Sequence, residues 1–324
     1  MNVFQSLPLL GGLSPAQFMQ RHWQKKPLLV RQALAGGSPL LSPAELFALA
    51  GQDDVQSRLV SQQPGGWRLR QGPFSRRALP PLKRPGWTLL VQGVDRHQQA
   101  AHELLQAFRF APDCRLDDLM VSYVPHGGDV GPHFDSYDVF LLQGQGKRLW
   151  RISEQSDLSL VEGAPMRILK NFDTKQEWLL EAGDMLYLPP HLAHWGIAVS
   201  DGDQDCMTYS IGFRAPKNQE LASEFLGFMQ DKINQESIPL SGLYQDADLS
   251  LQAHPAEISA NMVATVSAQL QSIQWSNGTV AEFLGHYLSE PKSHVVFDTN
   301  KKISQTAFLK QASSRGLSLD LKSL

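Results

Sequence analysis

The chain has 324 residues, of which 42% are hydrophobic and 19% charged, and its formal net charge is −3. This length suffices for two domains with a buried core, and the composition excludes a collagen, a coiled coil or a wholly disordered protein. Because no apolar run is long enough to span a bilayer and the N-terminus shows no secretory signal, we expect a cytoplasmic protein without a membrane partner. The slight acidic excess argues against direct nucleic-acid binding, which would need a local basic patch.

Only two cysteines occur, Cys114 and Cys206, and they stand in unrelated sequence contexts. Their number excludes a cysteine-based metal site and argues against a disulfide framework. We therefore expect both to lie in the core as small apolar residues.

The first fifty residues contain two helix starts of the same design. Ser14-Pro15-Ala16-Gln17 and Ser42-Pro43-Ala44-Glu45 each combine Ser at the N-cap, Pro at the first helical position and Gln or Glu at the third. This is the reciprocal pattern of a capping box, and it predicts helices over about 15–23 and 43–50. Between them Leu28-Leu29-Val30, entered through Pro27, predicts a short buried strand.

Short β-rich segments bounded by Gly, Pro or Asp fill the middle of the chain. They are interrupted by a predicted helix over 97–108, where Leu104, Leu105 and Phe108 have helical spacing. Many short strands at close intervals are typical of a β-sandwich or barrel. The predicted strands cover residues 87–91, 119–124, 138–142, 148–152, 185–188, 196–199 and 207–213.

After Ala215 the pattern becomes helical. Apolar stripes predict helices near 221–233 and 258–273, and two more candidates follow at 279–288 and 303–315, the last closed by Gly316 as a C-cap. We interpret the stripes as the core of this module or as a dimer interface, and we favour a homodimer. The chain stops at Leu324 without a recognisable stop signal, which leaves open whether the natural protein is longer.

A possible metal site begins with His133 and Asp135. If this stretch is a β-strand, both side chains point to the same side, because side chains alternate between the two faces of a strand. Two imidazoles and one carboxylate on one face form the ligand set of a non-haem Fe(II) centre that activates oxygen. The third ligand has to come from another strand, and both His191 and His194 are candidates.

The same alternation predicts the orientation of the neighbouring side chains. Tyr137 shares the face of the two ligands, and the opposite face carries Phe134, Ser136 and Asp138. A glycine-rich bend over 127–132 precedes the ligands and would allow a close backbone approach at the mouth of a barrel.

Several motifs occur in a characteristic order over roughly residues 1–216. They are Trp23-x-x-Lys26-Pro27-Leu28-Leu29, Gly131-Pro132-His133-x-Asp135-x-Tyr137-Asp138-Val139-Phe140, Gln143-Gly144-x-Gly146-x-Arg148-x-Trp150-Arg151, Pro189-Pro190 before His194-x-Gly196, and Tyr209-Ser210-x-Gly212-Phe213-Arg214-Ala215-Pro216. In this order the chain resembles the bacterial JmjC-type ribosomal oxygenases, in particular those that hydroxylate an arginine of a large-subunit ribosomal protein.

The resemblance implies a fold and a division into domains. Residues 1–216 would form a mainly β double-stranded β-helix, the jelly roll of cupin and JmjC proteins, with flanking helices. Residues 217–275 would be an all-α dimerisation region. Residues 276–324 would be a winged-helix-type module, whose completeness within this chain stays open.

Carried over by position, the resemblance implies that His133, Asp135 and His194 bind iron. His194 is preferred over His191 because it is followed by Trp195-Gly196, where the family has His-x-Gly. His191 is then interpreted as a rim or packing residue.

Arg148 matches the arginine that pairs with the distal carboxylate of 2-oxoglutarate in this family. The role suits a guanidinium, which makes two parallel hydrogen bonds to a carboxylate and stays charged when buried. The alternative for Arg148 is a solvated hairpin arginine. Ser122 and Ser210 are hydroxyls that could assist 2-oxoglutarate, with plain strand packing at least as well supported for each.

The implied function is an Fe(II)-, 2-oxoglutarate- and O2-dependent hydroxylase of an arginine in a ribosomal protein. Tyr137, Asp129 and Asp138 are the candidates to receive the guanidinium of the substrate. Histidyl hydroxylation, a small-molecule cupin enzyme and a non-enzymatic metal-containing scaffold that binds a ribosomal partner remain alternatives. The site alone does not separate arginine from histidine as the target residue.

Overall fold

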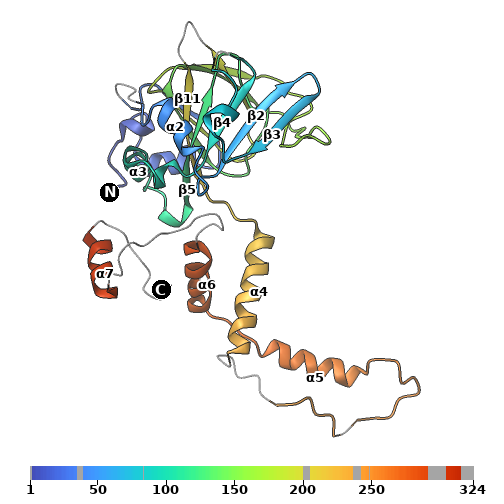
Figure 1. The fold of residues 1–324 in the computed structure, drawn as a ribbon. Coiled ribbons are helices and arrows are strands. Elements are labelled where there is room, and N and C mark those ends of the chain that lie inside the picture. The colour runs from blue at the N-terminus through green and yellow to red at the C-terminus, as the bar shows by residue number, and fades with distance from the viewer. Residues whose placement is uncertain are drawn as a thin grey trace. The chain divides into compact units, whose positions relative to one another are not determined.

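The structure is a computed structural model that describes residues 2–34, 39–82, 84–199, 205–235, 242–247, 249–290 and 304–314. Two compact units divide between Ala215 and Pro216 (Figure 1). None of the helices in these described ranges is long and apolar enough to cross a membrane. The division of the chain into three parts stays a prediction.

Eleven strands of the first unit form two antiparallel sheets. The larger sheet has the order β1-β9-β6-β11-β5-β4-β2-β3, and the smaller has the order β10-β7-β8. The larger sheet consists of β1 (Leu28–Val30), β2 (Ser57–Gln63), β3 (Gly66–Gln71), β4 (Trp87–Val91), β5 (Leu116–Val124), β6 (Val139–Gln145), β9 (Met185–Leu188) and β11 (Cys206–Phe213). The smaller sheet consists of β7 (Lys147–Ser153), β8 (Gln176–Leu180) and β10 (Ala193–Val199).

The two sheets pack face to face. Alternate residues of β6, including Val139 and Leu141, pack against Trp150 and Ile152 of β7 in one buried cluster. The residue between them, Phe140, points to the other side and belongs to the main core. Strands buried on both faces explain the continuous apolar runs in the sequence. The arrangement confirms the predicted β-rich core with flanking helices.

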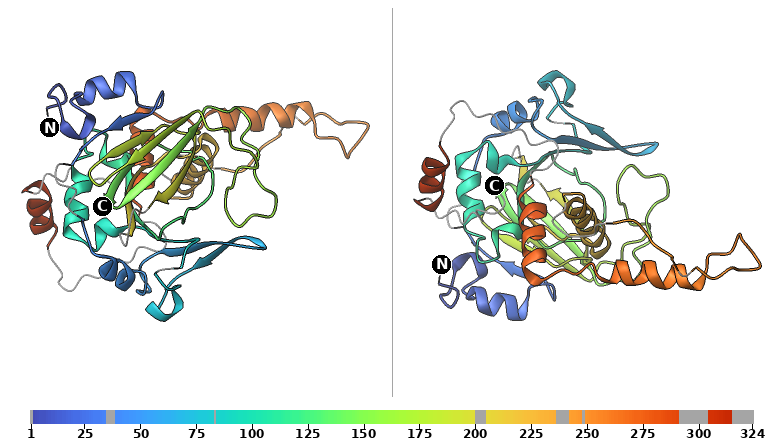
Figure 2. Two further views of the ribbon diagram at one scale, coloured as in Figure 1. Left: turned by 90° about the horizontal axis from the view of Figure 1, so that it is seen from above. Right: turned by 90° about the horizontal axis from the view of Figure 1, so that it is seen from below.

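Three helices cover the outer face of the larger sheet (Figures 1 and 2). They are α1 (Pro15–Arg21), α2 (Pro43–Leu49) and α3 (Gln99–Gln106). Phe18 of α1 is fully buried and lies edge-on to Tyr187 of β9, with ring centroids 4.9 Å apart. Both predicted capping boxes form, because the Ser14 and Ser42 side chains accept hydrogen bonds from the backbone three residues ahead.

Short 3-10 helices connect these elements, and strands β2, β3 and β8 are not among the predicted strand ranges. The 3-10 segments are η1 (Pro8–Leu10), η2 (Arg76–Ala78), η3 (Val94–Arg96) and η4 (Asp113–Arg115). Strands β2 and β8 lacked a clear periodic signal in the sequence. Of the two unpaired cysteines, Cys206 is buried as expected, whereas Cys114 is exposed and that part of the prediction is wrong.

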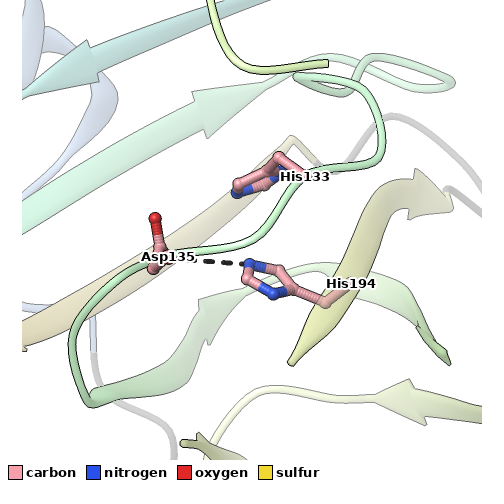
Figure 3. Close-up of side chains that lie close together, drawn as sticks. All are labelled: His133, Asp135 and His194. Carbon is pink, nitrogen blue, oxygen red and sulfur yellow. Dashed lines mark ion pairs between the residues drawn. The ribbon is translucent and has the colours of Figure 1, made fainter. Parts of the chain in front are cut away.

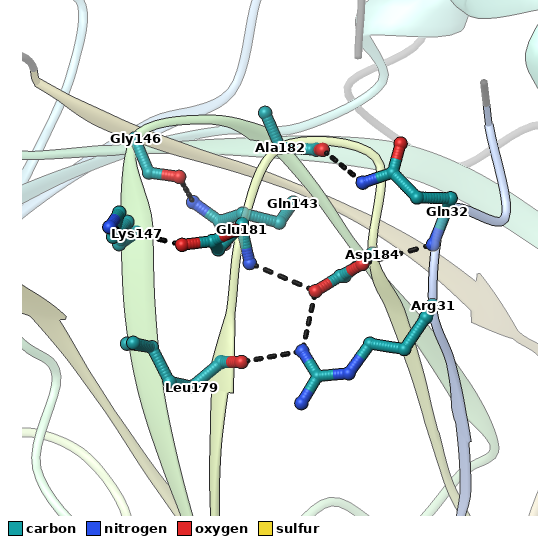
Figure 4. A network of polar contacts seen from close by, with 9 residues as sticks. All are labelled: Arg31, Gln32, Gln143, Gly146, Lys147, Leu179, Glu181, Ala182 and Asp184. Carbon is teal, nitrogen blue, oxygen red and sulfur yellow. Dashed lines mark hydrogen bonds and ion pairs between the residues drawn. The ribbon is translucent and has the colours of Figure 1, made fainter. Parts of the chain in front are cut away.

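The turn between β8 and β9 is tied to the N-terminal region through Asp184 (Figure 4). Its carboxylate accepts hydrogen bonds from the Arg31 guanidinium at 2.6 Å and from the Gln32 backbone at 3.0 Å. Although burial acts in the opposite direction, these bonds and the one from the Glu181 backbone hold the pKa of Asp184 below its usual value. The Asp184 carbonyl accepts a bond from the Gln143 backbone, so the same turn also supports β6.

The second unit contains the helices α4 (Asn218–Asn234), α5 (Ala260–Gln271), α6 (Asn277–Ser289) and α7 (Gln305–Ser314). They confirm the four helices predicted after residue 215, while Gly316 lies outside the described residues. Phe225 of α4 packs edge-on against Phe283 of α6, with ring centroids 5.3 Å apart. The roles of this region in dimerisation and as a winged-helix module stay predictions.

Candidate metal centre and cosubstrate pocket

One group of metal-ligating side chains forms in the first unit. His133, Asp135 and His194 each offer one ligand atom, and these atoms lie within 4.8 Å of one another (Figure 3). The backbones of His133 and His194 pair as an isolated bridge, with N–H to carbonyl distances of 3.0 and 2.8 Å. His191 does not belong to this group, and its side chain is exposed.

The segment that carries His133 and Asp135 is not a regular strand, contrary to the condition on which the prediction rested. Only His133 makes a bridge, and Asp135 lies in an irregular stretch before β6. As a result the strict alternation fails, because Phe134 and Ser136 line the same cavity as the ligands. The Asp135 carbonyl instead accepts a hydrogen bond of 2.7 Å from the backbone of His191.

Backbone carbonyls set the tautomers of both histidines. Nδ1 of His133 lies 2.9 Å from the Gly131 carbonyl, and Nδ1 of His194 lies 2.8 Å from the Leu192 carbonyl. Since a carbonyl only accepts, each Nδ1 is the protonated donor and each Nε2 keeps its lone pair. Burial, and next the nearby His133, lower the pKa of His194 to about 4, which keeps this imidazole neutral at physiological pH. Two imidazoles beside a carboxylate fit a divalent iron ion.

The three side chains open into a cavity of about 540 Å³. The cavity lies between the two sheets and reaches the β2–β3 hairpin. Its lining includes four more of the predicted site residues, namely Arg148, Ser122, Ser210 and Tyr137.

Arg148 is a buried cation within this lining, with 3% of its surface exposed. Its Nη1 donates to the hydroxyls of Ser122 and Thr208, each at 3.0 Å, while its Nε has no hydrogen-bond partner. Among the residues that the structure describes, no carboxylate lies within ion-pair distance of Arg148. Burial lowers the pKa of this guanidinium, but a guanidinium stays protonated in proteins, so Arg148 is a buried positive charge without a carboxylate in direct contact among the described residues. A solvated hairpin arginine, the alternative interpretation, does not describe this side chain.

Thr208 and Gln143 support Arg148 and were missed in the sequence. Thr208 of β11 pairs directly with Ser122 of β5, and its hydroxyl donates to the Gln143 side chain at 3.0 Å. The sequence could have indicated Thr208 as a site residue, because side chains two positions apart on a strand share a face and Ser210 was already a candidate. Trp150 was also missed, and its ring lies 5.0 Å from the Arg148 guanidinium.

Asp129 and Asp138 lie outside the cavity lining. The Asp129 carboxylate accepts a hydrogen bond of 2.6 Å from the Gly131 backbone, and burial raises its pKa above the usual value. Asp138 is fully buried and accepts hydrogen bonds from Tyr187 at 2.6 Å and Gln24 at 3.0 Å. Both carboxylates therefore have local structural partners.

Tyr137 and Asp117 both line the cavity, and we call the part of the lining between them the slot. Gly212 of β11 lies between them, since a Cβ added there would be 3.8 Å from the Tyr137 ring and 3.9 Å from Cβ of Asp117. The absence of a side chain at Gly212 keeps this space open. Tyr137 is 38% exposed, so the slot communicates with solvent.

Known proteins share these features. A family model described as the JmjC domain matches residues 103–221. The ribosomal protein uL16 3-hydroxylase of Escherichia coli (strain K12) is 40% identical over 245 residues, which cover 74% of this chain and 62% of that protein. A probable ribosomal oxygenase of Haemophilus influenzae is 32% identical over 281 residues, covering 85% of this chain and 65% of that protein. The chain thus spans less than two thirds of the length of either relative.

The fold of the chain is also similar to that of a solved ribosomal oxygenase. YcfD, a ribosomal oxygenase from Escherichia coli, was solved in complex with cobalt and 2-oxoglutarate and aligns with a TM-score of 0.74 at 32% identity. The alignment covers 94% of this chain and 78% of that chain. Together with the JmjC match and the His-Asp-His group, these similarities show that the chain belongs to the bacterial JmjC-type ribosomal oxygenase family.

Proposed function

We propose that this protein is an Fe(II)- and 2-oxoglutarate-dependent hydroxylase that acts on an arginine side chain of a large-subunit ribosomal protein. One observation carries the proposal: a His-Asp-His group and a buried arginine without a described carboxylate partner share a single cavity. The names of the relatives support the substrate class, since one of them is a hydroxylase of ribosomal protein uL16.

His133, Asp135 and His194 would hold the iron. The Nε2 atoms of both histidines carry lone pairs, and the Asp135 carboxylate, 3.7 Å from Nε2 of His194, supplies the negative ligand. When bound, iron together with 2-oxoglutarate and O2 supplies the chemistry that hydroxylates an unactivated carbon. The residues of the chain hold the ligand atoms in place and exclude water from the buried side of the cavity.

Arg148 would bind the distal carboxylate of 2-oxoglutarate. Its charge lies in a region of low dielectric, where an anion gains more from pairing than it would in water. Ser122 and Thr208 fix the guanidinium through Nη1, and the Gly196 carbonyl accepts a longer bond of 3.4 Å from Nη2, so that Nε alone has no protein partner. Ser210, also in the lining, adds a hydroxyl on the same strand as Thr208.

The slot between Tyr137 and Asp117 would admit the target side chain. An arginine suits this slot because its guanidinium can stack on the aromatic ring while a carboxylate neutralises its charge. We assign Tyr137 to substrate binding. Asp117, whose carboxylate also lies 3.5 Å from Nε of Arg214, replaces Asp129 as the proposed acidic contact, because Asp129 lies outside the cavity lining.

The function is tested by mass spectrometry of the reaction products. The full chain is incubated with Fe(II), 2-oxoglutarate and large-subunit ribosomal proteins, and succinate is quantified in parallel. We expect a peptide whose mass has increased by one oxygen atom on an arginine, and we expect the amount of succinate to rise together with the amount of this peptide.

Other outcomes point to specific alternatives. Oxygen incorporated on a histidine would replace the arginine assignment by histidyl hydroxylation. If neither succinate nor an oxidised peptide forms, the protein is a scaffold and the enzymatic proposal fails.

A further inference from the structure

The cationic residues of this chain are unevenly distributed. Between Asp54 and Asp95 there is no acidic residue, so all 32 carboxylate side chains lie outside this segment. The same segment contains seven cationic residues, which are Arg58, Arg68, Arg70, Arg76, Arg77, Lys83 and Arg84. An acidic chain with so basic a segment has a segregated surface charge, which its net charge does not reveal.

Five of these arginines form what we call the basic edge, consisting of Arg68, Arg70, Arg76, Arg77 and Arg84. All five are exposed, and none has an ion-pair partner among the residues that the structure describes. Arg68 and Arg70 lie on β3, the outermost strand of the larger sheet. The η2 segment and the approach to β4 provide the others.

Local contacts hold part of the basic edge together. Nη1 of Arg70 donates to the Ala78 carbonyl at 3.4 Å, which ties β3 to η2. The guanidinium groups of Arg70 and Arg76 lie over the rings of Phe74 and Phe47 at 5.4 and 5.1 Å. These cations are therefore held at the rim of the sheet with their charge unneutralised.

We propose that the basic edge binds the phosphate backbone of RNA. Arg68 and Arg70 follow the edge strand β3, and none of the five arginines lines the cavity described above, so the arrangement fits a polymer better than a single phosphate group. All five are arginines, whose planar fork pairs with phosphate oxygens through two hydrogen bonds.

The choice of RNA over other polyanions rests on the proposed function, because a ribosomal protein is a substrate that occurs together with RNA. Two residues of the basic edge, Arg68 and Arg70, lie on β3 on either side of Leu69, which lines the cavity, so RNA bound there would accompany a substrate in the cavity. The basic edge is a local basic patch of the kind that direct nucleic-acid binding would need in a chain with a net charge of −3.

The test measures fluorescence anisotropy of a short labelled single-stranded RNA with the full chain, without iron or cosubstrate. The Arg68→Glu/Arg77→Glu variant reverses two charges at side chains with no hydrogen bond or ring contact among the described residues. Its control, Arg21→Glu/Lys26→Glu, makes the same change at two exposed cations elsewhere. We expect the first variant to weaken RNA binding about tenfold and the control by less than about twofold.

Three outcomes of the binding measurements would contradict RNA binding by the basic edge. The proposal is overturned if wild type does not bind RNA, if both variants lose affinity equally, or if duplex DNA or anionic lipid vesicles bind more tightly than RNA. Because binding needs no iron, RNA binding with the expected variant pattern supports the basic edge even if the hydroxylase assay fails. Circular dichroism of both variants verifies that each is folded.

Discussion

Arg148 is a buried cation, and its surroundings indicate which kind of ligand the cavity binds. A buried cation is costly unless an anion or several hydrogen bonds compensate it. The hydroxyls of Ser122 and Thr208 bond Nη1 of Arg148, the Gly196 carbonyl accepts a longer bond of 3.4 Å from Nη2, and Nε has no partner. The protein therefore maintains a charge that an incoming carboxylate can neutralise.

Replacing Arg148 with Met tests this interpretation at the level of binding and stability. Met has a similar length and no charge, so we expect the free energy of unfolding without ligand to change by no more than about 1 kcal/mol. Adding saturating 2-oxoglutarate to the Mn(II)-loaded proteins should raise the melting temperature of wild type through binding to the folded state, but not that of the variant. An equal ligand-induced shift in both proteins, measured by calorimetry, would remove Arg148 from the cosubstrate site.

Gly212 offers a graded test of the substrate slot. A Cβ at this position would make ordinary contacts of 3.8 and 3.9 Å, so Gly212→Ala should be tolerated. Gly212→Val adds two methyl groups between Tyr137 and Asp117, and we expect KM for the protein substrate to rise at least about tenfold. Decarboxylation of 2-oxoglutarate in the absence of substrate serves as the control and should persist. Unchanged KM in the valine variant would place the substrate elsewhere.

At the scale of elements, sequence patterns within a few residues predicted helix starts correctly, whereas contacts between distant segments could not be predicted from such patterns. The capping boxes at Ser14 and Ser42 involve residues three positions apart, so the sequence contains all the information needed. The grouping of His133 with His194 joins segments about sixty residues apart; the residues alone left His191 and His194 open as the third ligand, and the family resemblance selected His194. Strand β8 was missed because its pairing with β7, and not its own periodicity, stabilises it.

The orientation of residues around the ligands shows the limit of periodic reasoning. The prediction that Phe134 points away from Asp135 required a regular strand. The chain instead makes a single bridge at His133 and then an irregular stretch, which brings Phe134 and Ser136 into the cavity lining. Alternation is reliable only where a ladder of hydrogen bonds enforces it.

The pairing of β6 with β11 depends on close packing at Gly144. A Cβ there would lie 2.3 Å from the ring of Tyr209, which is almost completely buried. We expect Gly144→Ala to lower the free energy of unfolding by about 1–3 kcal/mol in chemical denaturation. Gly65→Ala, where no atom lies within 4 Å of the added Cβ, is the matched control and should have a small effect. Equal effects of the two substitutions would argue against this packing.

At the scale of the whole molecule, the homodimer remains a proposal that depends on the second unit. Phe225 is unsuitable for testing it, because its ring packs against Trp275 and Phe283 within that unit. Leu226 on α4 and Val263 on α5 are 63% and 57% exposed and are better choices. We expect Leu226→Glu/Val263→Glu to give a folded monomer by light scattering. A variant that stays dimeric would exclude these two side chains from the interface.

The central claim is that His133, Asp135 and His194 hold an iron ion that turns over 2-oxoglutarate. The most direct measurement is succinate formation with Fe(II) in three proteins, namely wild type, Asp135→Ala and His191→Asn. His191 lies close to the group without belonging to it, and asparagine tolerates its positive φ of 63°. The account predicts that succinate formation is lost in Asp135→Ala and retained in His191→Asn. Unaltered succinate formation by Asp135→Ala would contradict it.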